Sequence, residues 1–162
     1  MKNKISINLE VSLVEIIFSI LIFAIAGAIM LYCFAAARFT QIKANDKVVA
    51  GSIVQSNAEM IKSFDSSSDM NEYFSENYKF NTTSKNEITY INYYDKHWNI
   101  CDEESKIYFI SVRVKDVSYI YGEMKEISIT AEKEKPYPFV DNNNNIYEIH
   151  TKKFYPSNEG RW

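Results

Sequence analysis

The chain contains few of the residues that cross-link or interrupt a fold. Its 162 residues include two cysteines, three prolines and four glycines. Cys33 lies in a long apolar run and Cys101 lies far beyond it. A disulfide between them would have to join a thiol embedded in a membrane to a thiol in a globular part of the chain. We therefore expect two free thiols and no disulfide framework. No proline precedes Pro136, so the first half of the chain is open to a long helix.

The sequence also lacks a block of basic residues. Eighteen lysines and arginines stand against 21 aspartates and glutamates, which gives a formal net charge of −3. A surface that follows the phosphates of a nucleic acid needs a dense positive patch, and no such cluster occurs here. Nucleic acid is therefore not an expected partner.

Residues suited to catalysis or metal binding are sparse. His97 and Cys101 in "HWNIC" are an isolated histidine and cysteine. The second pair of histidine or cysteine ligands that would complete a metal site does not occur near them in the sequence, and their spacing alone does not indicate a catalytic pair. The segment "DNNNN" begins like a calcium loop at Asp141, but Ile146 stands where the EF-hand turn needs glycine and Lys152 replaces the closing glutamate. We expect loop residues and a polar turn, with no catalytic residue, no metal and no cofactor.

What the sequence does contain is an uncharged apolar run from Ile16 to Ala37. As a helix rising ~1.5 Å per residue, this run crosses the ~30 Å hydrocarbon core of a bilayer. Glu15 stands at its start and Glu10 lies just before it. A charge deep in a bilayer costs roughly 2.5–3.5 kcal/mol, so Glu15 needs either a partner or a place at the interface with its carboxylate in water.

A cleaved secretory signal is one alternative reading of the same run. The basic start "MKNK" and the small residues before Arg38 fit such a signal, which would leave a mature chain beginning at Arg38. Signal cores usually span about 7–15 apolar residues, whereas this run is longer and begins with a carboxylate. The run therefore favours a retained membrane helix.

The helical pattern continues beyond the apolar run. Large apolar residues recur at steps of seven and four, which places them on one helix face: Ile42, Val49, Ile53, Met60 and Phe64. Gly51 interrupts the pattern only weakly. The sequence predicts one helix from about Ser12 to Phe64, transmembrane over residues 11–37 and amphipathic over 38–64.

The remainder, residues 65–162, reads as a small head domain. "DSSSDMN" predicts a loop in which Ser68 or Asp69 caps a short helix over residues 70–78. Alternating segments then predict strands, at Glu87–Tyr94, Lys106–Lys115, Met124–Glu132 and, less regularly, 146–155. The expected fold class is α+β, with a long N-terminal helix packed on a small antiparallel sheet whose other face meets water.

"SLVEIIFSILIFAIAGA" (residues 12–28) resembles the N-terminal signature of the type IV pilin and type II secretion pseudopilin superfamily. In that family a basic leader precedes a cleavage bond, and a glutamate is the fifth residue after it. The resemblance implies a pilin-like fold, a leader over residues 1–10, and cleavage by prepilin peptidase between Glu10 and Val11. It also implies that the Val11 amine pairs with Glu15 of a neighbouring subunit.

Further implications of the resemblance concern partners and location. It implies a single-pass membrane protein with a cytoplasmic N-terminus and an extracytoplasmic head. Its partners would be other subunits, an assembly platform protein and that platform's ATPase. The chain would then be a non-enzymatic minor pilin or pseudopilin that enters an extracellular filament.

One position departs from the family pattern. The residue before the bond is normally glycine or another small residue, whereas here it is Glu10. Three readings follow: a peptidase that accepts glutamate, an uncleaved pilin-like membrane protein, or a degenerate copy. Without cleavage there is no amine at Val11, and Glu15 would need another cation. The alternative function is an unprocessed, signal-anchored extracellular binding or enzymatic domain that does not polymerise.

Overall fold

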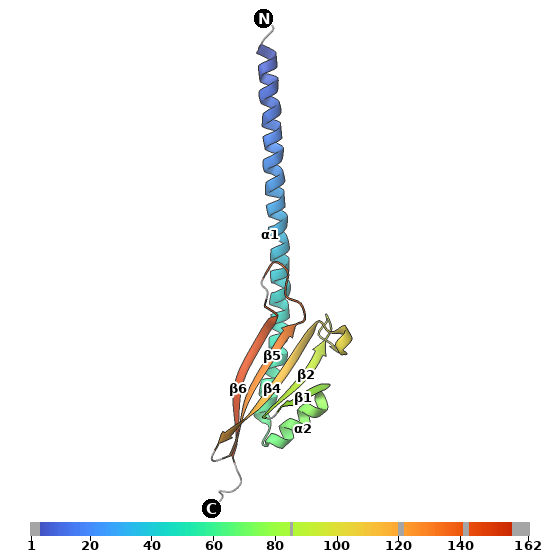
Figure 1. Cartoon of the computed structure of the whole chain (residues 1–162), viewed down its shortest axis with the longest axis vertical. Helices are drawn as coiled ribbons and strands as arrows, with labels where there is room; N and C mark the ends of the chain where they lie inside the picture. The colour runs from blue at the N-terminus through green and yellow to red at the C-terminus, as the bar shows by residue number, and fades with distance from the viewer. Residues whose placement is uncertain (1–3, 85, 120–121, 141–142, 157–162) are drawn as a thin grey trace, which may run out of the picture.

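The computed structural model describes residues 4–84, 86–119, 122–140 and 143–156, with backbone alone for 4–12 and 118–119. These residues form two α-helices, α1 (Lys4–Ser63) and α2 (Ser67–Asn77), and a short 3₁₀ helix, η1 (Glu103–Ser105). The strands are β1 (Phe80–Ser84), β2 (Glu87–Tyr94), β3 (Ile100–Cys101), β4 (Tyr108–Tyr119), β5 (Gly122–Lys133) and β6 (Asn145–Pro156). The expected α+β layout, a long helix followed by a small antiparallel sheet, is confirmed (Figure 1).

Helix α1 is the longest element of the molecule. Its 60 residues extend roughly 90 Å at the usual rise of about 1.5 Å per residue. It begins at Lys4 and not near Ser12, so its backbone runs without a break through the Glu10–Val11 bond. The N-terminal half projects away from the head, which we define as α2 and the sheet (Figure 1).

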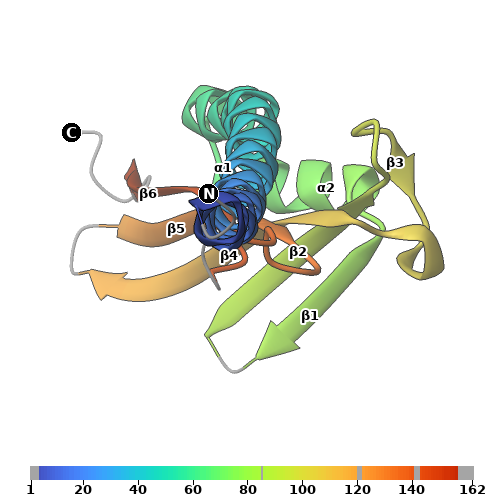
Figure 2. The same ribbon diagram turned by 90° about the horizontal axis from the view of Figure 1, so that it is seen from above.

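The sheet has the order β1-β2-β4-β5-β6, and β3 pairs with the end of β2. All of these pairings are antiparallel, with registers such as Val112 opposite both Tyr90 and Ile129. The predicted alternation is confirmed on β4, because Ile110, Val112 and Val114 are buried while the residues between them are not. Both helices cover the buried face of this sheet (Figure 2).

The face of α1 that packs on the sheet differs from the one expected. Its buried residues lie on one face of the helix: Asp46, Ala50, Gly51, Val54, Ala58 and Ile61. Of the residues expected there, Ile42, Ile53 and Phe64 lie partly buried at the edge of the core. Val49 and Met60 are each 38% exposed. Alanines at the centre let the helix backbone approach the strands closely, and a search for large apolar residues passes over them.

Helix α2 closes the end of the core that lies away from the N-terminus. Its N-cap is Ser66, whose side chain accepts a hydrogen bond of 3.1 Å from the Asp69 N–H, so neither Ser68 nor Asp69 is the cap. Met70 and Phe74 are fully buried, and the Phe74 ring stacks on that of Tyr90 at 5.4 Å. The helix thereby continues the hydrophobic layer begun by α1.

Gly51 offers a test of the helix–sheet contact. A Cβ added there would meet the ring of Tyr147 at 3.5 Å, an ordinary van der Waals distance. Since glycine is about 0.8–1.0 kcal/mol less favourable than alanine in a helix interior, Gly51→Ala should raise the free energy of unfolding by about 0.5–1 kcal/mol. Urea unfolding of the full chain in detergent micelles measures this, with Gly27→Ala as control because no neighbour lies within 4 Å of it. A destabilised Gly51→Ala variant would contradict the geometry at Tyr147.

Candidate functional site

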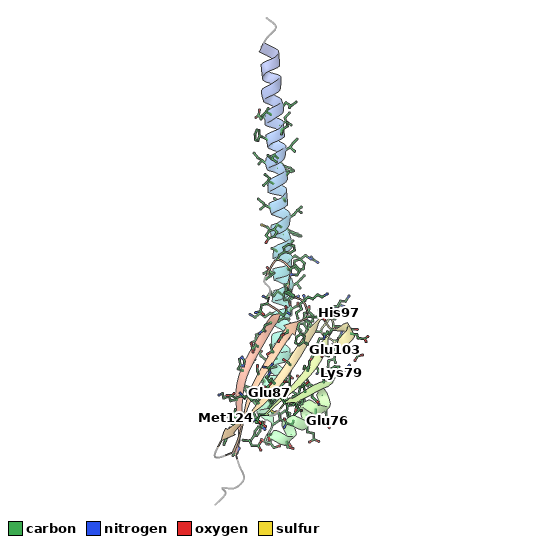
Figure 3. The ribbon with its side chains drawn as sticks, in the orientation of Figure 1. Glu76, Lys79, Glu87, His97, Glu103 and Met124 are labelled. Carbon is green, nitrogen blue, oxygen red and sulfur yellow. The ribbon has the colours of Figure 1, made fainter. Side chains whose placement is uncertain are left out.

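The candidate site has two parts, and the first is the apolar half of α1. The large apolar residues from Leu13 to Phe34 are each more than half exposed, and their side chains project from the helix into open space (Figure 3). The most apolar window of this helix has a mean hydropathy of 2.6 and is not buried at all. Within the described residues, α1 is the one helix long and apolar enough to cross a membrane.

Glu15 is exposed among these apolar side chains. Its backbone carbonyl accepts a hydrogen bond of 2.8 Å from the Ser19 hydroxyl. Among the side chains that the structure describes, no cation forms an ion pair with its carboxylate. Glu10 and Val11 lie outside the residues whose side chains are described, so their expected parts in cleavage and assembly stay predictions.

The second part of the site is the junction between helix and head, centred on Asp46. This carboxylate is 8% exposed, and its Oδ2 accepts hydrogen bonds from the Tyr108 hydroxyl at 2.8 Å and from the Tyr137 hydroxyl at 2.6 Å. Tyr108 lies on β4, and Tyr137 lies in the connection from β5 to β6. One oxygen atom of α1 therefore fastens both the sheet and this connection to the helix.

The groups around Asp46 suit its role as a hydrogen-bond acceptor. Burial and then the hydrogen bond to Asp46 raise the pKa of Tyr108, so its hydroxyl stays a donor. The Lys133 ammonium lies 3.9 Å from the centroid of the Tyr137 ring. Burial lowers the pKa of Lys133 while the Asp46 charge raises it. The carboxylate thus has two hydroxyl donors and a nearby cation, which is how a buried charge is tolerated.

The connection between β5 and β6, residues 134–144, also reaches the apolar half of α1. The ring of Phe139 lies edge-on to Tyr32, with 5.6 Å between centroids, and 5.8 Å from the ring of Phe39. In Figure 1 this connection extends past the ends of the strands along the helix. The junction therefore spans α1 from Tyr32 to Asp46.

The "HWNIC" segment forms an ordered turn at a corner of the sheet (Figure 3). The Asp95 carboxylate accepts hydrogen bonds from the backbone N–H groups of His97 and Asn99, at 2.8 and 2.9 Å. Burial, followed by the charges of Asp95 and Asp102, raises the pKa of Cys101, which disfavours its reactive thiolate. Cys33 and Cys101 are both free thiols, as expected.

No metal-binding cluster of three or more His, Cys, Asp or Glu side chains occurs in the described part of the chain. Asp141 lies outside the described residues, and the Asn143 side chain accepts a hydrogen bond of 2.9 Å from the Asn145 N–H. Ile146 is buried, and Lys152 pairs with Glu126 at 2.6 Å. Asn143 thus forms part of a turn, Ile146 belongs to the core, and Lys152 forms a surface pair on β6.

The outward face of the sheet carries a shallow hollow of about 570 Å³. Its walls are charged, and opposite charges on neighbouring strands already pair, as Arg113 does with Glu87 at 3.2 Å. Exposed pairs of this kind contribute little to stability. The hollow lies on the polar face of the sheet, which the alternation of apolar and polar residues in the strands predicted.

Sequence reasoning missed the junction residues Asp46, Tyr108, Tyr137 and Phe139. A signal for Asp46 was present, since it is the one carboxylate between Glu15 and Glu59. The sequence holds no local signal for the two tyrosines and Phe139, because their role depends on the contact between the β5–β6 connection and α1, which are far apart in the chain.

Loss of the Asp46 carboxylate should loosen the head from the helix. Asp46→Ala leaves two buried tyrosine hydroxyls without an acceptor and should cost about 2–4 kcal/mol of stability. Asp46→Asn keeps one oxygen that both hydroxyls can reach and should cost about 1 kcal/mol, for the lost charge. Denaturant unfolding of the full chain in micelles, followed by the fluorescence of Trp98 stacked on Tyr108, measures both. Equal stability of Asp46→Ala and the parent would refute the role of this junction.

Comparison with known proteins does not add a relative. No family model matches the chain, and no curated protein or solved structure matches it significantly.

Proposed function

We propose that the chain is a non-enzymatic minor pilin or pseudopilin, a structural subunit of a type IV pilus-like or type II secretion-like filament. The observation that carries this proposal is the setting of Glu15, a single carboxylate at the start of an exposed, uncharged helix half. That half continues as one helix into a segment packed on an antiparallel sheet. The pilin-like motif at residues 12–28 and this order of elements support the same reading.

In this proposal the apolar half of α1 serves two environments in turn. In the membrane it lies in lipid, with the N-terminus in the cytoplasm and the head outside. An assembly platform protein and its ATPase then draw the subunit into a filament, where the apolar halves of many subunits pack together. Glu15 of one subunit pairs with the Val11 amine of its neighbour, and the pair sets the stagger between helices.

The energetics of a buried charge explain why such a pair would act as a register. Removing one partner of a buried ion pair costs about 3–5 kcal/mol, because the other charge is left uncompensated. A subunit out of register would suffer the same loss. The amine exists only if prepilin peptidase cuts between Glu10 and Val11, so Glu15 can act in this way only after cleavage.

The positive charges beside the apolar run do not decide the orientation. Lys2 and Lys4 precede it, and Arg38 and Lys43 follow it. Since orientation in membranes follows the excess of lysine and arginine on one side, this balance leaves both orientations open. The cytoplasmic N-terminus therefore rests on the resemblance to pilins.

Glu10 favours a second candidate function. Because glutamate stands where the peptidase normally meets a small residue, the chain can also be an unprocessed, membrane-anchored head that binds a ligand or acts as an enzyme outside the cell without polymerising. This candidate keeps the membrane helix and the orientation but gives Glu15 no partner amine.

Replacement of Glu15 separates the two candidates. If Glu15 pairs with the Val11 amine, Glu15→Val should lower the amount of the chain in sheared filaments at least tenfold, because about 1.4 kcal/mol corresponds to a factor of ten and the lost pair is worth more. Immunoblots of filament and membrane fractions measure the split. Glu59→Val, an exposed carboxylate of the same helix nearer the head, is the matched control. Wild-type incorporation of Glu15→Val would refute the assembly role.

The native cysteines test the orientation. If the head is extracytoplasmic, a membrane-impermeant maleimide should label Cys101 on intact spheroplasts, while Cys101→Ser should leave only Cys33 in lipid and give no labelling. Because burial raises the pKa of Cys101, the reaction should accelerate as the pH rises from neutrality and the thiolate fraction grows. Labelling only after lysis would place the head in the cytoplasm.

A further inference from the structure

The β5–β6 connection carries an exposed aromatic side chain in a fixed position. Phe139 is 57% exposed and has a φ of 63°, a conformation that is rare for a bulky residue. Strained residues persist only where their surroundings hold them. Here Tyr137 is fastened to Asp46, the Val140 N–H donates to the Tyr137 carbonyl at 3.4 Å, and Val140 packs against the core.

The contact between Phe139 and Tyr32 fixes the level of this ring along α1. Tyr32 lies inside the uncharged run, less than two helical turns before its end at Ala37. If the run spans the hydrocarbon core, Tyr32 lies just inside the boundary of that core. Phe139, in ring contact with Tyr32 and with Phe39, is then held at the same boundary. Aromatic rings are enriched at this level of membrane proteins.

The charges near this ring suit the headgroup layer. Arg38 on α1 and Lys135 beside Pro136 in the connection are both exposed. Between Glu15 and Glu59 the helix has one carboxylate, Asp46, and it is buried. The opposite end of the head is acidic, with exposed carboxylates on and beside α2: Asp65, Asp69, Glu72 and Glu76. Arg38 and Lys135 therefore lie toward the apolar half of α1, with the exposed Glu134 next to Lys135 in the connection.

We propose that the β5–β6 connection is a second membrane contact, in which the Phe139 ring inserts at the bilayer boundary and Arg38 and Lys135 bind anionic phospholipid headgroups. The head is thereby seated on the lipid surface at a fixed height and does not swing freely on α1. This inference rests on the membrane insertion of α1 in the proposed function and is independent of polymerisation.

Tryptophan quenching by lipid measures this contact. The full chain is reconstituted in vesicles whose acyl chains carry or lack bromine, a contact quencher of tryptophan. Phe139→Trp adds an emitter at the connection. Phe154→Trp is the matched control, since Phe154 is 41% exposed and pairs with Met124 at the far end of the sheet (Figure 3). The fluorescence of the parent chain is subtracted from both.

The emission added by Phe139→Trp should fall roughly twofold in brominated vesicles, because a ring at the core boundary contacts the acyl chains, while that of Phe154→Trp stays unchanged. The fall should be larger in vesicles with phosphatidylglycerol than in pure phosphatidylcholine. Combined Arg38→Gln and Lys135→Gln replacement should abolish that difference between the lipids. Glu15→Val should leave all of these results as they are, because the contact needs no neighbouring subunit.

Three results would each overturn a different claim. A chain that floats with the vesicles but shows no quenching at Phe139→Trp refutes the membrane contact and leaves the insertion of α1 standing. A quenching that is equal in both lipids refutes the headgroup contacts of Arg38 and Lys135. A chain that fails to float in any variant refutes the insertion itself, and with it the proposed function.

The Phe139→Asn variant controls for the role of the ring in insertion, since asparagine tolerates the positive φ at this position. It should float like the parent chain, which would show that insertion does not need the ring.

Discussion

A single carboxylate oxygen governs where the head lies on the helix. Asp46 is buried on α1, and its Oδ2 accepts hydrogen bonds from Tyr108 on β4 and from Tyr137 in the β5–β6 connection. The rest of the helix–sheet contact is apolar, with Ala50 and Ala58 at its centre, and apolar contacts give close approach but little directionality. The hydrogen bonds from the two hydroxyls fix the orientation of the head on the helix, because a buried carboxylate that lost its hydrogen-bond donors would be strongly destabilised. The position of Phe139 beside Tyr32 depends on the same oxygen through Tyr137.

This junction divides α1 into two halves with opposite requirements. Beyond it, one face of the helix packs on the sheet, and the helix is stabilised by the head. From Leu13 to Phe34 the helix exposes its large apolar side chains. Such a surface suits lipid or, in the proposed filament, the helices of other subunits. Glu15 lies at the start of the apolar half. A carboxylate there is stable in water or beside a cation, and its burial in lipid without a cation costs free energy. The proposed function follows from this contrast.

The sequence predicted local features well and long-range contacts poorly. The absence of proline and the apolar spacing predicted one long helix, and alternation located β2 at its observed bounds and β4 and β5 within a few residues. Strand β1 was missed because "FNTTS" is polar, exposed throughout and held only by pairing with β2. The predicted packing face of α1 differs from the observed one because alanines, Ala50 and Ala58, lie at the centre of the observed face. Tyr137 and Phe139 act through contacts far apart in the chain, which no local pattern encodes.

Both proposed roles of α1 require that its apolar half remains part of the mature protein. The intact mass and N-terminal sequence of the chain recovered from cells test this directly. We expect a mature protein that still carries Glu15, with Val11 as its first residue if prepilin peptidase cuts after Glu10 and Met1 if it does not. A mature chain that begins at Arg38 would contradict both roles, because the membrane helix and Glu15 would have been removed as a signal.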